Sequence, residues 1–333
     1  MKIAFQAEGD AATGAGHALR CLALADAIQA IEPDAEIAFA ARDETFAALP
    51  RLARFGRMAP EPAPCDLAVI DGYRFDQTVE AAWAAQGARV AAMEDQPGRR
   101  HRCDTLIDPA PVRRPVDYRG LISAGTELLL GLRYALTAPD LRARRQEAMT
   151  RRRTPLGVRR VLVSTGLGDV GDGAVTALEA LKGLSFVQRI DVAVGSGARS
   201  RTALIRLAAA DPRVKLLFDA EGMDELMLAA DLAIGAAGGS AWERCVLGLP
   251  SLVLIAADNQ SDNAAALADA GAAAVLGCAG EVSPAALASE VQRLHTDAAA
   301  RRSMARAASK LVDGRGAERV ARVLLRGLSA WKP

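Results

Sequence analysis

The sequence lacks a disulfide framework. Its cysteines, Cys21, Cys65, Cys103, Cys245 and Cys278, are odd in number, form no C-x-x-C pair and lie among apolar neighbours. Small exported proteins pair their cysteines, whereas this pattern is typical of reduced and buried thiols. We therefore expect a cytoplasmic protein.

The sequence also lacks an excess of charge and a long apolar run. Its 41 basic and 40 acidic side chains give a net charge of +1, so no overall field favours a polyanion such as nucleic acid. No stretch reaches the roughly 18 consecutive apolar residues that a membrane span requires. The chain runs from Met1 directly into an expected strand, and we expect neither export nor stable membrane insertion.

Histidine and aromatic residues are scarce. The three histidines, His17, His101 and His295, are scattered along the chain, so we expect no metal site and no cofactor. Aromatic residues make up only 4% of the chain, which means that Ala, Leu and Val must fill the core.

The chain does have enough length and apolar residues for two cores. Its 333 residues are about twice the size of an ordinary domain. Short apolar runs alternate with helical stretches in both halves, which is typical of parallel sheets covered by helices. The expected strands are Lys2–Phe5, Glu36–Ala40, Leu67–Ile70, Arg89–Met93 and Thr105–Ile107, then Val161–Thr165, Ile190–Val194, Val214–Phe218, Leu232–Gly235, Ser251–Ile255 and Ala273–Leu276. We expect two Rossmann-like, doubly wound α/β domains that face a cleft.

The alternation lapses between Arg133 and Arg160, where arginines and turn residues crowd together. We place the first domain at residues 1–140, a basic linker at 141–158, expected to be a solvated helix and linker, and the second domain at 159–333. An anion-binding arm is the alternative for the linker. The last helix, expected at Ala317–Leu328, could pack back on the first domain, and the sequence leaves this open.

The first candidate site is a glycine loop after the first strand. Gly14 and Gly16 precede a helix whose first turn contains His17. Exposed amides and the positive end of the helix dipole favour a diphosphate there. Leu19 occupies the third glycine position of the dinucleotide fingerprint, so NAD is not expected. A purely structural turn is the alternative.

His17 stands where Asp, Ser or Thr would be usual for capping alone. A neutral imidazole can accept a proton near neutral pH, which makes His17 the candidate general base. A helix-start residue without a chemical role is the alternative.

The second candidate site follows the expected strand Leu232–Gly235. Gly238 and Gly239 leave room for a ligand, and we expect Ser240 to cap the next helix beside a bound phosphate. Glu243, on the first turn, could accept hydrogen bonds from ribose hydroxyls. Alternatively, Ser240 and Glu243 form a capping box that needs no ligand.

Three further polar residues follow strand ends. Asn259 could hold a sugar substituent or cap the next helix. Asp71 and Asp95 could each act as a second acid or base, but we expect both to cap the helices that follow them.

These segments resemble a known family. The motifs are similar to those of the UDP-sugar hydrolases of pseudaminic acid synthesis, which are relatives of the peptidoglycan N-acetylglucosaminyltransferase. The resemblance rests on Gly14-Ala15-Gly16-His17, Arg20-Cys21-Leu22, Val69-Ile70-Asp71-Gly72-Tyr73, Glu94-Asp95, His101-Arg102-Cys103-Asp104, Leu130–Leu136, Gly238-Gly239-Ser240, Trp242-Glu243 and Asn259-Gln260. It covers most of the first half and, in the second, chiefly residues 232–263.

The resemblance implies a glycosyltransferase-B fold and a specific reaction. Water would cleave a UDP-activated 2,4-diacetamido-2,4,6-trideoxy sugar with inversion and without a metal, for flagellin or surface glycan modification. His17 would be the catalytic base, and Tyr73 and Asn259 would hold the sugar. The implied UDP-binding residues are Gly14, Gly16, Met223, Gly239, Ser240 and Glu243, with the uracil near Met223. One departure is the loop Thr165–Asp169, where relatives often carry paired glycines followed by Ser or Thr and Asp.

Two other functions stay open. An inverting UDP-sugar-dependent glycosyltransferase would use the same pocket with a lipid or protein acceptor, and the stretch Phe46–Met58 could offer a membrane-bound acceptor an apolar, basic patch. We expect a plain amphipathic surface helix there instead. A non-catalytic nucleotide-binding scaffold would need Ser240 and Glu243 but not His17. The Ala-rich helices suit a monomer or a dimer equally, so the sequence predicts neither oligomeric state over the other.

Overall fold

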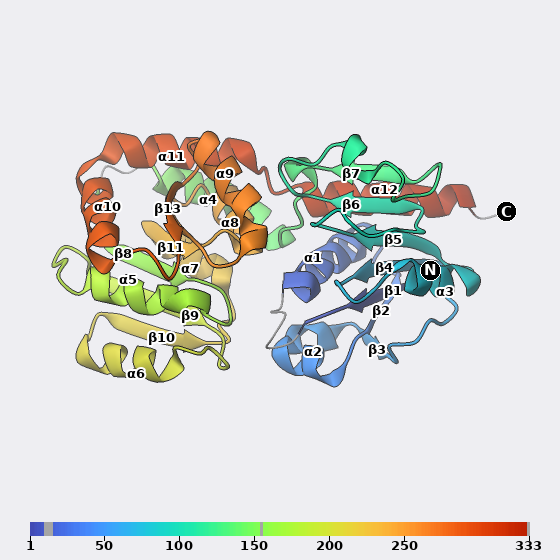
Figure 1. The fold of residues 1–333 in the computed structure, drawn as a ribbon, viewed down its shortest axis with the longest axis horizontal. Helices are drawn as coiled ribbons and strands as arrows, with labels where there is room; N and C mark the ends of the chain where they lie inside the picture. The colour runs from blue at the N-terminus through green and yellow to red at the C-terminus, as the bar shows by residue number, and fades with distance from the viewer. Residues whose placement is uncertain (10–15, 154–155, 332–333) are drawn as a thin grey trace. The chain divides into compact units, whose positions relative to one another are not determined.

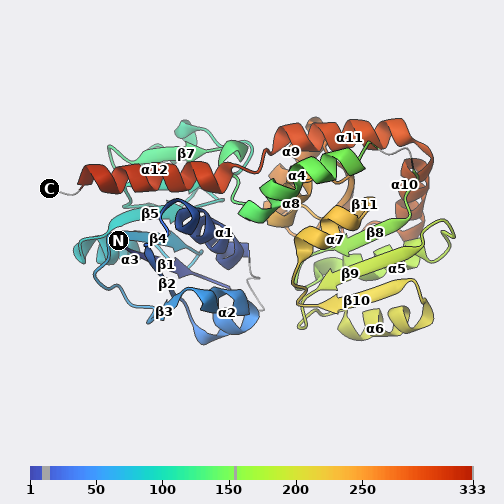
Figure 2. The ribbon, with the colours of Figure 1, turned by 180° about the vertical axis from the view of Figure 1, so that it is seen from behind.

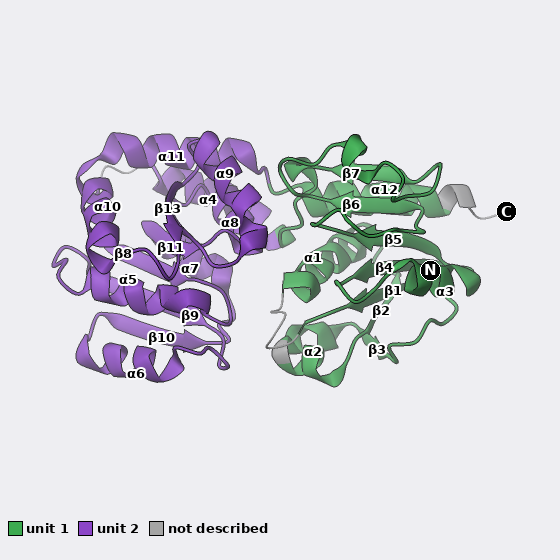
Figure 3. Ribbon diagram, in the orientation of Figure 1, with its two compact units in different colours: residues 1–139, 314–333 green, residues 140–313 purple. Residues whose placement is uncertain are grey.

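The computed structural model describes residues 1–9, 16–153 and 156–331, and the chain divides into two compact units. Unit 1 comprises residues 1–139 and 314–333, and unit 2 comprises residues 140–313 (Figure 3). Each unit is a parallel sheet covered by helices (Figure 1). The two predicted doubly wound α/β sheets are therefore confirmed.

The sheet of unit 1 has the strand order β3-β2-β1-β4-β5-β6-β7. Its strands are β1 (Lys2–Ala7), β2 (Glu36–Ala40), β3 (Gly56–Met58), β4 (Leu67–Asp71), β5 (Arg89–Met93), β6 (Thr105–Asp108) and β7 (Glu127–Leu130). Its helices are α1 (Gly16–Ile31), α2 (Asp43–Ala48), α3 (Gln77–Ala85), α12 (Gly316–Trp331) and the short η1 (Pro50–Arg54), η2 (Pro115–Tyr118) and η3 (Leu132–Tyr134). The order reverses between β1 and β4, and ligands of such sheets bind where the order reverses.

Alternate residues of these strands face two separate cores, because successive strand side chains point to opposite faces. Ile3 and Phe5 pack in one cluster with α1 and α12, whereas Ala4 packs in another with Trp83 of α3. Seen from behind, α1 and α12 lie in front of the sheet (Figure 2). The sheet of unit 1 is thus buried on both faces.

The sheet of unit 2 has the strand order β10-β9-β8-β11-β12-β13 and reverses between β8 and β11. Its strands are β8 (Arg160–Ser164), β9 (Arg189–Val194), β10 (Val214–Phe218), β11 (Leu232–Ala236), β12 (Ser251–Ile255) and β13 (Ala274–Cys278). Its helices are α4 (Pro139–Arg151), α5 (Gly173–Leu181), α6 (Arg201–Ala210), α7 (Met223–Ala229), α8 (Gly239–Val246), α9 (Ser261–Asp269), α10 (Pro284–Thr296), α11 (Ala298–Leu311) and the short η4 (Val170–Asp172) and η5 (Asp258–Gln260).

Every expected strand forms, with ends shifted by at most one or two residues, but the edge strands β3 and β7 were not predicted. An edge strand pairs on one side only, and β3 has just three residues, Gly56, Arg57 and Met58, without an apolar alternation. Strand β3 therefore does not carry the pattern of a strand buried on both faces. Strand β7 has only three leucines after Glu127, a run too short to predict a strand by itself.

The last helix belongs to unit 1. Val320, Ala321 and Leu324 of α12 are buried in the same cluster as Leu24 and Ile28 of α1. At the start of α12 the backbone of Gly316 packs so closely against that of Ala135 that only glycine fits, since a Cβ on Gly316 would lie 2.1 Å from the carbonyl oxygen of Ala135.

The basic stretch at residues 141–158 contains a helix as expected, but it is less solvated than expected. Helix α4 runs through most of it, and Arg152 is only 8% exposed. Arg152 donates to the carbonyls of Met227 and Ala230 at the end of α7, and Arg145 donates to those of Val246 and Val312. Guanidinium groups satisfy carbonyls at helix C-termini and complement the negative end of the dipole, so the arginines of this stretch are only partly solvated.

Two smaller expectations were wrong. The stretch at Phe46–Met58 is no single amphipathic helix and no apolar patch, because α2, η1 and β3 follow one another and Phe46, Leu49 and Leu52 are buried in the core. Cys278 is exposed rather than buried. Among the helices of the described residues, none has the length and apolarity to cross a membrane.

Candidate active site

His17 and Asp71 form a buried pair at the point where the strand order of unit 1 reverses. His17 lies in the first turn of α1 and is 6% exposed, and Asp71 ends β4 and is fully buried. His17 Nδ1 lies 2.7 Å from Asp71 Oδ1. An ionised carboxylate only accepts hydrogen bonds, so Nδ1 carries the proton and Nε2 is left as the acceptor. This is the tautomer that a general base requires.

Arg20 keeps Asp71 ionised. It stands three residues after His17 on the same side of α1, and its Nε and Nη2 donate to the two carboxylate oxygens of Asp71, each at 2.6 Å. Burial alone would raise the pKa of Asp71, but the charge of Arg20 and the hydrogen bonds from Arg20 and His17 outweigh it and hold that pKa well below its usual value. Arg20 Nη1 also donates to Asp95 Oδ2 at 2.9 Å.

The expectation that Asp71 and Asp95 cap helices was wrong. Helix α3 is capped by Asp76, whose side chain accepts from the amides of Thr78 and Val79. Asp95 is followed by a loop that leads to β6. Both aspartates instead bind the guanidinium of Arg20.

Tyr73 lies against the imidazole of His17. The ring centroids are 4.7 Å apart at 90°, and the tyrosine is 43% exposed. Its hydroxyl donates to Asp95 Oδ1 at 2.9 Å, and its amide donates to the buried Glu8 at 3.0 Å. The loop needs glycine at position 72, because a Cβ on Gly72 would lie 2.4 Å from Cγ of Glu8.

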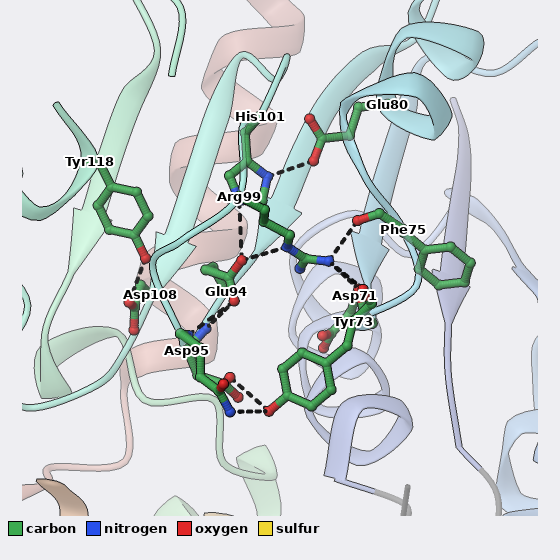
Figure 4. A network of polar contacts seen from close by, with 12 residues as sticks. Asp71, Tyr73, Phe75, Glu80, Glu94, Asp95, Arg99, His101, Asp108 and Tyr118 are labelled. Atoms are coloured by element: carbon green, nitrogen blue, oxygen red, sulfur yellow. Dashed lines mark hydrogen bonds and ion pairs between the residues drawn. The ribbon is translucent and has the colours of Figure 1, made fainter. Parts of the chain in front are cut away.

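A buried ionic network supports the loops that carry Tyr73 and Asp95 (Figure 4). Glu94 Oε1 accepts from the amides of Asp95 at 2.9 Å and Gln96 at 3.0 Å, and its Oε2 accepts from Arg99 Nε at 2.7 Å. Arg99 Nη1 donates to three carbonyls of the loop at residues 72–75. One network thus holds the loops after β4 and β5.

His101 lies at the centre of this network. Its Nδ1 contacts Glu80 Oε1 at 2.7 Å and its Nε2 contacts Glu94 Oε2 at 3.1 Å. Burial would lower the pKa of His101, but the two carboxylates outweigh it and raise that pKa to about 9. For Glu94, burial is outweighed by His101 and Arg99, which lower its pKa to about 2. At neutral pH the imidazole is a cation between two carboxylates.

The second candidate site, in unit 2, is the start of α8. Gly238 is the N-cap residue and no side chain caps the helix, so the expectation that Ser240 caps it or forms a capping box with Glu243 was wrong. Ser240 Oγ instead accepts from Arg244 Nη1 at 3.1 Å. The first amides of a helix have no intrahelical partner and point to an anion, and Gly239 is exposed there.

Two side chains from the segment after β12 hold the loop before α8. Gln260 Oε1 accepts from the amides of Ala237 and Ala256, both at 3.2 Å, and Asn263 Nδ2 donates to the carbonyl of Ala237 at 3.0 Å. The loop is therefore fixed before any ligand arrives. The loop after β8 is closed on itself, since Asp169 accepts from Thr165 at 2.6 Å.

The remaining predicted residues lie in the following places. Asn259 is exposed in η5 and does not cap α9, whose N-cap is Gln260. Met223 is half-buried at the start of α7. A Cβ on Gly16 would meet nothing within 4 Å. Gly14 lies outside the described residues. No group of three or more metal-ligating side chains occurs within the described part of the chain.

Sequence reasoning assigned no role to Arg20, Glu8, Arg99 or Arg244. Arg20 carried a signal, because a spacing of three places it beside His17 on a helix. Arg244 carried a similar signal, because a spacing of four places it beside Ser240 on α8. Glu8 and Arg99 carried none, since they bind the loop after β4.

Comparison with known proteins agrees with this architecture. Residues 176–320 match the glycosyltransferase family 28 C-terminal domain. The spore coat polysaccharide biosynthesis protein SpsG of Bacillus subtilis (strain 168) is 28% identical over 208 residues, which cover 62% of this chain. The match spans 60% of the length of that relative.

Solved structures with the same fold cover the whole chain. MurG of Acinetobacter baumannii is 17% identical with a TM-score of 0.64, over 98% of this chain and 99% of that one. The UDP-GlcNAc 2-epimerase of Neisseria meningitidis, bound to UDP-GlcNAc, is 12% identical with a TM-score of 0.64, over 98% and 100%. The fold is therefore the glycosyltransferase-B fold.

Proposed function

We propose that this chain is a UDP-sugar hydrolase that releases UDP and a free 2,4-diacetamido-2,4,6-trideoxy hexose, with His17 as the general base. The proposal rests on the His17–Asp71 pair, because the buried, ionised carboxylate of Asp71 holds Nδ1 of His17 and leaves Nε2 to accept a proton. The imidazole is only 6% exposed and has Tyr73 at its edge, which suits a nucleophile as small as water.

In the proposed reaction, His17 Nε2 accepts a proton from water while the water oxygen bonds to the anomeric carbon. The bond from that carbon to the β-phosphate oxygen breaks, and UDP leaves with the electron pair, so the configuration inverts. The amides at the start of α8, with Gly239 and Ser240, stabilise the charge on the departing diphosphate. Tyr73 and Asn259 are assigned to the sugar, Glu243 to the ribose and Met223 to the uracil.

The comparisons support the coarser part of the proposal, an enzyme that acts on a nucleotide sugar. The name of SpsG suggests a place in polysaccharide biosynthesis, and the neisserial structure was solved with a UDP-sugar. The resemblance of the motifs supports the finer part, the pseudaminic acid pathway and its substrate, for flagellin or surface glycan modification.

An inverting glycosyltransferase is the second candidate, favoured by the match to the glycosyltransferase family 28 C-terminal domain. It would use the same base on the hydroxyl of a lipid or protein acceptor. One argument for a membrane-bound acceptor is removed, because Phe46, Leu49 and Leu52 are buried.

The deciding experiment incubates the purified full chain with UDP-2,4-diacetamido-2,4,6-trideoxy-β-L-altropyranose without acceptor, lipid or added metal. Proton NMR follows the release of UDP and the anomeric configuration of the first free sugar. Stoichiometric release of the inverted anomer is expected. UDP binding without release would contradict the hydrolase and favour the transferase.

The variant His17→Asn tests the base, and His295→Asn in unit 2 is its matched control. We expect His17→Asn to lower kcat roughly 10²- to 10⁴-fold, the range of general base catalysis, with UDP affinity kept. Turnover that survives in His17→Asn would refute the catalytic assignment.

A further inference from the structure

Arg244 is a buried cation with an unusual environment. It is 1% exposed, its Nη2 donates to the carbonyl of Ala236 at 2.6 Å, and its Nη1 donates to Ser240 Oγ at 3.1 Å. Its Nε is buried without a hydrogen-bond partner, as is Nε of Arg152, and its other two nitrogens bind a carbonyl and a hydroxyl rather than a carboxylate. Buried charges normally carry a paired counter-charge, and the nearby charge of Glu243 offsets the burial of Arg244 only in part.

The position of the guanidinium makes the imbalance larger. Arg152 and Arg301 bind carbonyls at the ends of α7 and α10, where the helix dipole is negative and a cation is stabilised. Arg244 comes from the last turn of α8, but its side chain reaches back to Ser240 in the first turn. Its charge therefore lies at the positive end of its own helix, where a cation is disfavoured and an anion is favoured.

The surrounding residues are shaped to hold the guanidinium there. A Cβ on Gly235, in β11, would lie 2.9 Å from Arg244 Nη1 and 2.6 Å from the carbonyl oxygen of Ser164. The loop above it is fixed by Gln260 and Asn263. The fold thus keeps a buried positive charge beside the start of α8, where Gly239 is exposed, at a cost in folding stability.

We propose that Arg244 is a positioning residue for the diphosphate of the nucleotide sugar, supplying from beneath the start of α8 the positive charge that the bound diphosphate neutralises. This inference rests on the proposed function, because it takes the nucleotide to bind at α8. It names the part of the ligand that the start of α8 selects, which is the diphosphate rather than the nucleoside.

Ser240 connects the buried charge to the ligand. Its oxygen already accepts a hydrogen bond from Arg244, so its own hydroxyl proton is directed elsewhere and can be donated to a phosphate oxygen. Burial lowers the pKa of Arg244 to about 10, an effect that Cys245 and Glu243 only partly offset. The guanidinium is therefore still a cation at neutral pH.

The test compares the binding of UDP and of uridine to the full-length protein by isothermal titration calorimetry. The variants are Arg244→Gln, which removes the charge, and Arg244→Lys, which keeps it. We expect Arg244→Gln to lower UDP affinity roughly 10- to 100-fold, because one charge in a partly buried site contributes that much, and to leave uridine affinity unchanged. Arg244→Lys should keep most of the preference for UDP.

Arg152→Gln is the matched control, because it removes another buried arginine that binds two carbonyls of unit 2. It should lower the melting temperature and leave the ratio of UDP to uridine affinity unchanged. A variant of Arg244 that loses both affinities equally would overturn the proposal, since that result indicates a structural role alone.

The Lys variant keeps the proposal testable if Arg244→Gln does not fold. A loss of the UDP preference in folded Arg244→Lys would also overturn it. If the wild-type protein binds neither ligand, the proposed nucleotide site fails and this inference fails with it. If the wild type binds UDP but the ratio of UDP to uridine affinity is the same in the Arg244 variants, the nucleotide site stands and this inference alone is wrong.

Discussion

The charged state of His101 should stabilise unit 1 over a defined pH range. Both ring nitrogens contact carboxylates, those of Glu80 and Glu94, and the pKa of His101 is raised to about 9 from the ordinary value of 6.5. A difference of about 2.5 pKa units corresponds to about 3 kcal/mol of differential interaction. Because the folded-state pKa is the higher one, this stability is fully present below about pH 6.5 and is lost as the pH rises through about 9.

A double-mutant cycle measures this term. The variants His101→Gln, Glu80→Gln and the double variant are unfolded with urea at pH 6.5 and at pH 10. Trp83 is fully buried in unit 1 and donates to Gln6 at 2.6 Å, so its fluorescence reports on that unit once the other two tryptophans are replaced by phenylalanine.

We expect a coupling energy between His101 and Glu80 of roughly 1.5–3 kcal/mol at pH 6.5, the range of hydrogen bonds to charged groups. At pH 10 the imidazole is mostly neutral and has a single N–H for the two carboxylates, so the coupling should fall. Equal coupling at the two pH values would refute the reasoning, because the pair would then be held by packing or by a neutral hydrogen bond.

Three further predictions follow from the geometry. Asp71→Asn should lower kcat roughly 10²-fold or more, measured by steady-state kinetics, and should keep the UDP affinity, measured by calorimetry. An unchanged kcat would rule out a catalytic role for the His17–Asp71 pair. Gly72→Ala should lower the free energy of unfolding by roughly 1–3 kcal/mol in chemical denaturation, because the added Cβ clashes with Glu8. Gly98→Ala, where the Cβ would meet nothing within 4 Å, should lower it less, and equal effects would contradict the clash. Leu324→Ala, in the core of unit 1, should lower the free energy of unfolding, followed by Trp83 fluorescence, by roughly 2–5 kcal/mol. No effect would mean that α12 does not complete that core.

The strands show where local pattern is enough. Arg89–Met93 and Ser251–Ile255 were predicted with the bounds that they have, because strands buried on both faces need continuous apolar runs bounded by turns. Strand β3 was missed, since at an edge its three residues need no such run. The stretch that contains helix α4 was predicted to be solvated because charge runs are usually exposed, yet Arg145 and Arg152 bind carbonyls of other helices.

In the candidate site, too, residues with a local sequence pattern were predicted and their distant partners were not. His17 and the glycine clusters were proposed as site residues because a glycine loop that leads into a helix has a local signature. The partners of these residues were not identified. Asp71 is 54 positions from His17 and was expected to cap a helix, and Ser240 was expected to cap α8 but binds Arg244.

The sequence by itself determined two parallel α/β sheets and the loops at which ligands of such sheets bind, because apolar periodicity and glycine spacing act over a few residues. Only the tertiary structure decided that α12 completes unit 1, that Asp71 holds His17 and that Arg244 lies buried beneath Ser240. The first two contacts join segments that are far apart in the sequence, and their approach depends on how strands order and helices pack. Arg244 and Ser240 are neighbours on one helix, but the burial of Arg244 depends on the strand end at Ala236 that packs against α8.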